Sequence, residues 1–191
     1  MQSFAPQQSN DVLRASHAIG AIFVTIFGGM WLVGWSLLAL PGSAGALAAI
    51  AVCALALLSI AGSQFRRYRS ALAVNKGSPQ QRKIILWFNI VNATQWVLVI
   101  GGVSVLNMIG QTAWIVPFIM LIVGLHFLPL AHIFTAPHNY VVGTLLTAFA
   151  LAYPFITPGG PQDPIGCLGA GLTLWGAAIY VLTKRVPAQG N

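Results

Sequence analysis

The side chains of this chain that could do chemistry are neutral polar groups set within long apolar stretches. Six of them lie in two neighbouring stretches, near 84–109 and 112–133: Asn89, Asn92, Gln95, Trp96, His126 and His132. On a helix the two asparagines and Gln95 occupy an arc of roughly 120°. Amides and imidazoles on such an arc can bind a small solute of little charge through hydrogen bonds. These six residues are therefore the predicted ligand-binding residues.

His126 is the first candidate because its depth in the membrane matches that of Asn92. Counted from the same membrane boundary, both lie about 10–12 Å inside, so adjacent antiparallel helices would bring them level. Pro129 has no N–H to donate to the carbonyl of Leu125, and helices broken at depth are tolerated where they line a cavity. We therefore expect the segment from Gly124 to His132 to be functional.

A purely structural role is the alternative for each histidine. A polar side chain in a membrane helix often only bonds a neighbouring helix, which contributes about 0.6–2 kcal/mol. His17, His132 and His138 lie near one membrane boundary, where histidine costs little, and a structural role is favoured for them. For His126 both interpretations stay open, because ionisable groups inside a membrane are functional by default.

The histidines form no recognisable metal motif. His126 and His132 lie about 120° apart around one helix, so that helix cannot present both to one ion. His17 and His126, on different helices, are the candidate pair for a metal or for the axial positions of a haem. The sequence contains no H-x-x-x-H or C-x-x-C spacing, and the expected state has no cofactor.

Carboxylates are nearly absent, which disfavours several classes of membrane protein. The chain has two acidic residues, Asp11 and Asp163, and both lie outside the apolar stretches. Proton- and sodium-coupled carriers place a carboxylate in the membrane. Hydrolases that activate water on a metal usually need one as a ligand or base. No catalytic residue is predicted, and an enzyme is disfavoured without being excluded.

Composition places these residues in an integral membrane protein. Only 6% of the residues are charged and 57% are hydrophobic, whereas soluble domains are about a quarter charged. Six apolar stretches have the length of a membrane span: 17–40, 43–62, 84–109, 112–133, 139–156 and 166–183. They predict a single all-α domain over 1–191, built as three helical hairpins. The first stretch is longer than a signal core and is expected to remain as a helix.

Charge determines the expected orientation. All nine Lys and Arg residues fall before the first stretch, between the second and third, or after the last. By the positive-inside rule, both termini are then cytoplasmic. The polar stretch Ser63–Lys83 is expected to be a loop or a short interfacial helix, whose basic residues can attract anionic lipid headgroups. A nucleic-acid partner is excluded, because this charge borders the membrane and no soluble domain carries it.

One segment resembles a known pattern. The stretch Gly-Leu-His-Phe-Leu-Pro-Leu-Ala from residue 124, followed by Pro137-x-x-Tyr140-x-x-Gly143, is similar to a pattern in small uncharacterised multi-pass bacterial membrane proteins. The resemblance covers the fourth and fifth spans. It implies a bacterial inner membrane and no particular activity.

Three functions stay open at this point. A channel, or a carrier of a small neutral or anionic solute, is favoured; a membrane partner or stress-response protein without transport or catalysis comes next. A redox or lipid-modifying enzyme that uses the histidines comes last. A carrier predicts polar side chains in the outer half as well, where Ser104, Asn107 and Tyr153 are the candidates. A homo-oligomer is compatible with a bundle of 191 residues.

Overall fold

The computed structural model describes residues 6–72 and 79–184, which form six α-helices and two short 3₁₀ turns. The helices are α1 (Pro6–Ala39), α2 (Ala44–Leu72), α3 (Pro79–Met108), α4 (Ile115–Ile133), α5 (His138–Ile156) and α6 (Ile165–Thr183). The turns are η2 (Thr112–Trp114) and η3 (Gly160–Gln162). All six helices are long and apolar enough to cross a membrane. The predicted all-α class and its six helices are confirmed, and they are compatible with an integral membrane protein.

Three helices run further than predicted. α1 already begins at Pro6, well before the predicted span 17–40. α2 continues as one helix to Leu72, and α3 already begins at Pro79. The predicted loop or separate short helix over Ser63–Lys83 is therefore wrong for the residues that the structure describes; residues 73–78 lie outside them. No glycine or proline interrupts residues 63–72, so nothing in the local sequence ends the helix at the membrane boundary. Proline is itself favoured at the first position of a helix.

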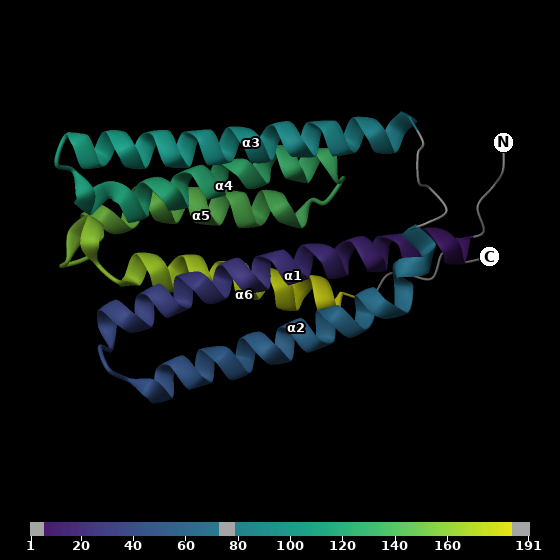
Figure 1. Cartoon of the computed structure of the whole chain (residues 1–191), viewed down its shortest axis with the longest axis horizontal. Helices are drawn as coiled ribbons and strands as arrows, with labels where there is room; N and C mark the ends of the chain where they lie inside the picture. The colour runs from purple at the N-terminus through teal and green to yellow at the C-terminus, as the bar shows by residue number, and fades with distance from the viewer. Residues whose placement is uncertain (1–5, 73–78, 185–191) are drawn as a thin grey trace.

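The helices form two groups of three that meet mainly through α5 and α6 (Figure 1). α1 packs between α2 and α6, and α4 packs between α3 and α5. α5 and α6 contact each other and join the two groups. The hairpins of the first and second and of the third and fourth helices are present. The fifth and sixth helices are also neighbours, but α5 packs more extensively on α4, and α6 on α1.

Glycines explain the close approach of α1 and α6. A Cβ atom on Gly171 of α6 would lie 2.5 Å from Cγ of Leu32 and 3.0 Å from the carbonyl oxygen of Gly28, both on α1. A Cβ atom on Gly28 would in turn lie 2.5 Å from the ring of Trp175. That ring donates a hydrogen bond from Nε1 to the carbonyl oxygen of Thr25 at 3.0 Å. Small residues thus permit the van der Waals packing that holds helices together in a membrane.

Tyr153 stabilises the contact between α5 and α6 at the end of these helices nearest η3. It is fully buried, and its hydroxyl donates a hydrogen bond to the carbonyl oxygen of Pro161 in η3 at 3.0 Å. Its ring stacks on Phe149, with 5.4 Å between the centroids. Gly166 of α6 makes room for the ring, because a Cβ atom there would lie 2.5 Å from Cζ of Tyr153. Tyr153 therefore connects α5, η3 and α6.

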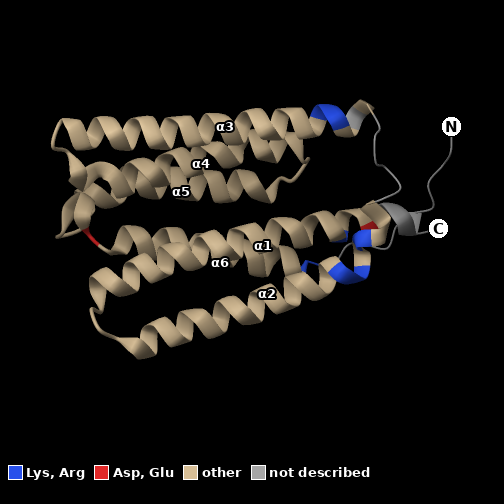
Figure 2. Cartoon of the chain, in the orientation of Figure 1, with Lys and Arg blue, Asp and Glu red and all other residues tan. Residues whose placement is uncertain are grey.

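The described basic residues lie at one end of the molecule. Lys76 and Arg185 are outside the described part, and the other seven of the nine are Arg14, Arg66, Arg67, Arg69, Arg82, Lys83 and Lys184. Figure 2 shows the described Lys and Arg positions together at the end of the molecule where α1 begins and α6 ends. Arg14 donates a hydrogen bond from Nη1 to the hydroxyl of Tyr68 at 2.7 Å, which joins α1 to the far end of α2. We refer to this end as the basic end.

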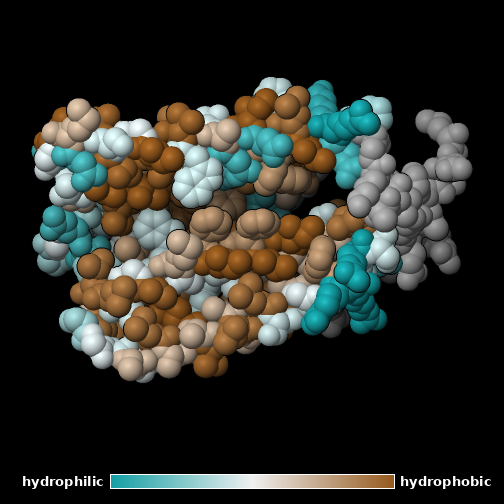
Figure 3. Space-filling view, in the orientation of Figure 1, coloured by the Kyte–Doolittle hydropathy of each residue, from teal (hydrophilic) through white to brown (hydrophobic). Residues whose placement is uncertain are grey.

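Between the two ends, the surface is mainly apolar. Figure 3 shows hydrophobic residues over most of the body of the molecule, with hydrophilic atoms at both ends. In this view hydrophilic atoms also interrupt the apolar surface over α3 and α4 (Figure 3). The interruption lies over the helices that carry the predicted ligand-binding residues.

Candidate functional site

A small cavity lies between α3 and α4, in the region where the sequence predicted a binding site. Its volume is about 200 Å³. Its lining residues are Ile90, Val91, Thr94, Gln95 and Leu98 from α3 and Ile122, Leu125, His126 and Pro129 from α4. The cavity is thus mainly apolar, with a hydroxyl, an amide and an imidazole as its polar side chains. Ligand sites commonly have this composition, in which a few polar groups orient a molecule held by apolar walls.

The structure brings together two of the six predicted residues, Gln95 and His126. The imidazole of His126 is directed at the backbone of Val91 across the helix contact. Its Nδ1 atom is buried and has no hydrogen-bond partner among the described residues. A buried polar atom without a hydrogen-bond partner is rare, because it costs stability. Nδ1 of His126 is therefore available to hydrogen-bond a bound molecule.

Pro129 and Thr94 complete the polar character of the cavity. α4 continues as one helix through Pro129 to Ile133, so the break expected at that proline is not present. The proline nevertheless has no N–H to donate to the carbonyl of Leu125, and both residues line the cavity.

Thr94 also lines the cavity and was not predicted from the sequence. Its signal was its position one residue before Gln95, on the side of the predicted arc that turns toward α4.

The other four predicted residues lie outside the cavity lining. Asn92 is half-buried, and its side-chain amide donates a hydrogen bond to the carbonyl oxygen of Phe88 in its own helix at 3.1 Å. Asn89, Trp96 and His132 are exposed, and none of them lines the cavity. The reason is geometric. Residues three apart on a helix point in directions that differ by about 60°. Gln95 faces α4, so Asn92 points about 60° away from it and Asn89 about 120° away.

Close packing of α4 on α5 holds the segment that carries His126. A Cβ atom on Gly124 would lie 2.6 Å from Oγ1 and 2.7 Å from the backbone nitrogen of Thr147 on α5. A Cβ atom on Gly143 of α5 would lie 2.8 Å from the carbonyl oxygen of Gly124. On its other side, α4 places the ring of Phe118 where a side chain on Gly102 of α3 would otherwise be. His126 is therefore carried by a helix that is fixed on two sides.

The histidine candidates for a metal do not lie together. His17 of α1 contacts His138 of α5 edge-to-face, with 5.9 Å between the ring centroids, and His138 in turn lies 6.0 Å from the ring of Tyr180. His126 is engaged with α3 instead. Among residues 6–72 and 79–184, no group of three or more His, Cys, Asp or Glu side chains could hold a metal ion. The His17–His138 contact was not predicted, because it depends on how α1 meets α5.

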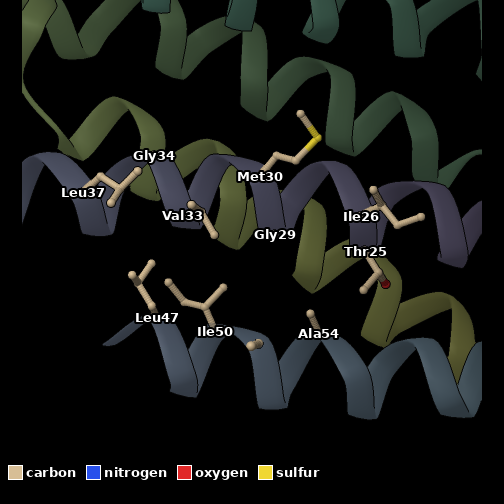
Figure 4. Close-up of a pocket in the computed structure, with 11 residues that line it drawn as sticks. Thr25, Ile26, Gly29, Met30, Val33, Gly34, Leu37, Leu47, Ile50 and Ala54 are labelled. Atoms are coloured by element: carbon tan, nitrogen blue, oxygen red, sulfur yellow. The ribbon is translucent and has the colours of Figure 1, made fainter. Parts of the chain in front are cut away.

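A second and larger cavity lies between α1 and α2 (Figure 4). Its volume is about 620 Å³. Its lining residues are Thr25, Ile26, Gly29, Met30, Val33, Gly34 and Leu37 from α1 and Leu47, Ile50, Ala51 and Ala54 from α2. Nearly all of these are apolar and none is titratable. Thr25 is the one polar side chain among these lining residues, so the groove offers little to orient a solute.

The polar candidates in the other half of the membrane do not extend the α3–α4 cavity. Ser104 and Asn107 are exposed on α3 and donate hydrogen bonds to carbonyl oxygens of their own helix. Tyr153 is buried between α5 and α6. The described residues therefore show a polar site in one half of the bundle and no polar path through it.

No family model, curated protein or solved structure matches the chain. The resemblance of the fourth and fifth spans to bacterial membrane proteins thus stays an expectation. Any functional conclusion rests on the geometry of the cavity itself.

Proposed function

We propose that this chain is a membrane-embedded carrier that takes a small, uncharged, lipid-soluble solute into the α3–α4 cavity. The observation that supports the proposal is the meeting of Gln95 and His126 on one cavity, with Nδ1 of His126 unpartnered. Five lining residues at its rim are exposed, which in a membrane opens the cavity toward lipid: Ile90, Thr94, Leu98, Leu125 and Pro129. The described residues show no polar path through the bundle, which argues against a channel and against a carrier of polar solutes. A lipid-soluble solute needs no such path, because it can enter the cavity from the bilayer.

The cavity sets limits on the solute. Because a water molecule occupies about 30 Å³ in the liquid, a cavity of about 200 Å³ has room for a solute of roughly seven to ten heavy atoms. The apolar walls require that most of these atoms be carbon. One or two hydrogen-bonding groups would meet Gln95 and His126, and a full charge would be expensive because no charged side chain lines the cavity.

Substitution of the two polar lining residues tests the proposal. Purified protein is heated with phenol or benzamide, which have the expected size and hydrogen-bonding groups, and the unfolding midpoint is measured. A probe present at a hundred times its dissociation constant should raise the midpoint of the wild type by about 5–10 °C. His126→Ala and Gln95→Leu should each weaken probe binding about 5- to 100-fold, because each leaves a partner group unsatisfied.

Asn107→Leu is the matched control, because this amide lies on the same helix outside the cavity and bonds its own backbone. It should leave the response to the probe unchanged. If His126→Ala lowers the midpoint without changing the response to the probe, His126 is structural. If neither probe affects the wild type, the proposed solute class is wrong.

We also infer that the basic end faces the cytoplasm of a bacterial inner membrane. The support is the gathering of the described Lys and Arg residues at that end, which is the pattern of the positive-inside rule. In a Cys53→Ala background, Gln162→Cys should react with a membrane-impermeant maleimide in intact spheroplasts. Ser70→Cys should react only after lysis. Both positions are exposed and lie at opposite ends of the molecule. The reverse labelling pattern would show that the protein has the opposite orientation in the membrane.

The second candidate function is a non-catalytic membrane partner. One observation favours it: no residue of α3 whose side chain is described is buried in the single chain. A helix so little covered has a large surface available to another protein. This function does not compete with solute binding at the cavity, because the cavity uses only one side of α3.

A further inference from the structure

The uncovered side of α3 carries a stripe of side chains with a definite spacing. Its residues are Asn89, Ala93, Trp96, Ile100 and Asn107, all of them exposed. At about 100° per residue, these five positions fall within about 60° around the helix. We call this set the α3 stripe. Its regular spacing gives α3 a second face, separate from the face that packs on α4.

The contacts between α3 and α4 lie well away from the α3 stripe. The ring of Phe88 packs on Phe134 with 5.6 Å between the centroids, and Gly102 receives the ring of Phe118. Phe88 and Gly102 lie about 100° or more around the helix from Asn89. The stripe therefore faces neither α4 nor the cavity, and in a membrane it meets whatever lies beside the protein.

Lipid is a poor neighbour for two residues of the stripe. Asn89 and the indole N–H of Trp96 make no hydrogen bond to another described residue. Counted from Lys83, they lie about 9 Å and about 20 Å along the helix. Hydrocarbon offers no hydrogen-bond partner, and tryptophan prefers the membrane surface to the middle of the bilayer. Asn107 differs, because its amide already bonds the carbonyl of Val103.

We propose that the α3 stripe is the interface at which two copies of this chain associate. A side-chain amide is both a donor and an acceptor, so it is complementary to its own copy. Two copies inserted in the same direction are related by a two-fold axis along the membrane normal, and residues near that axis meet their own equivalents at equal depth. Asn89 then bonds Asn89 of the second copy, and Ala93 lets the two helix backbones approach closely.

The proposal goes beyond solute binding and is independent of it. The cavity opens on the other flank of α3, where Ile90 and Leu98 lie. His126→Ala should therefore leave the dimer intact while it weakens probe binding. Failure of one proposal thus leaves the other standing.

Cysteine cross-linking tests the interface. Cysteines are placed one at a time at Ala93, Trp96, Ile100, Leu98 and Val105 in a background with Cys53→Ala and Cys167→Ala, and membranes are oxidised with copper phenanthroline. Ala93→Cys, Trp96→Cys and Ile100→Cys should give a disulfide-linked dimer. Leu98→Cys and Val105→Cys are equally exposed but lie on the opposite flank, and they should not. Cross-links at all five positions, at none, or only to a protein of another mass would overturn the proposal.

Removal of the amide tests the chemistry separately. Asn89→Leu should weaken self-association in liposomes about 3- to 30-fold, measured by energy transfer between labelled copies, as expected for one hydrogen bond between membrane helices. Asn92→Leu is the control and should change association less than two-fold, because this amide lies outside the stripe and bonds its own helix. Equal association of wild type and Asn89→Leu would show that the amide does not join the copies.

Discussion

Gly124→Ala should lower the free energy of unfolding by about 2–3 kcal/mol, and Gly124→Leu should yield no folded protein. The added Cβ atom would lie 2.6 Å and 2.7 Å from two atoms of Thr147 and 3.0 Å from the carbonyl oxygen of Gly143. Two of these three atoms belong to the backbone of α5, which cannot move aside as a flexible side chain can. Overpacking of this kind costs about 1–3 kcal/mol. Thermal or denaturant unfolding in detergent would measure the effect.

Gly101→Ala is the matched control for that change. Gly101 is also in a helix of the same protein, but a Cβ atom there would have no neighbour within 4 Å. Its replacement should leave the stability unchanged or raise it by up to about 1 kcal/mol, through the better helix propensity of alanine. If the two alanine variants behave alike, α4 and α5 do not approach as closely at Gly124 as the structure has them.

Tyr153→Ala should cost about 3–5 kcal/mol of stability, the range found when a large buried aromatic side chain is deleted. The substitution would remove the ring that fills the notch at Gly166 and stacks on Phe149, and it would free the carbonyl of Pro161. Because α5 and α6 join the two groups of helices, the loss should also separate those groups. Unfolding followed by tryptophan fluorescence, with limited proteolysis near η3, would detect both effects.

Tyr153→Phe separates the ring from the hydroxyl. It keeps the packing and loses the hydrogen bond to Pro161, so a loss of about 1–3 kcal/mol is expected. Tyr140→Phe is the control, because Tyr140 is exposed and its hydroxyl has no hydrogen-bond partner among the described residues. A Tyr153→Phe variant as stable as the wild type would show that the ring alone holds this contact.

The helices were predictable because a membrane leaves the backbone few choices. Long apolar stretches must become helices, and the six stretches do so. What the sequence did not reveal was where the helices end at the basic end. Hydropathy locates the edge of the apolar stretch, whereas the end of α2 depends on helix propensity, and residues 63–72 contain nothing that ends a helix.

The site was only partly predictable for a related reason. Depth along a helix follows from counting residues, and the count matched Asn92 with His126, whereas in the structure Gln95 lines the cavity with His126. The rotation of each helix about its own axis does not follow from counting. It is determined by contacts such as Phe118 over Gly102 and Gly124 against Gly143. For that reason Gln95 faces α4 while Asn89 and Trp96 face away.

The unequal lengths of the helices have a consequence for the lipid around the protein. α4, α5 and α6 have 19 residues each, or about 28 Å, close to the roughly 30 Å of hydrocarbon in a bilayer. α1, α2 and α3 have 34, 29 and 30 residues, or about 44–51 Å. The short helices therefore match the bilayer thickness, and the long ones exceed it by about 14–21 Å. A change in bilayer thickness would therefore create a hydrophobic mismatch first at α4, α5 and α6. The longer helices can accommodate it, because the arginine and lysine side chains at their basic ends can change depth among the lipid headgroups.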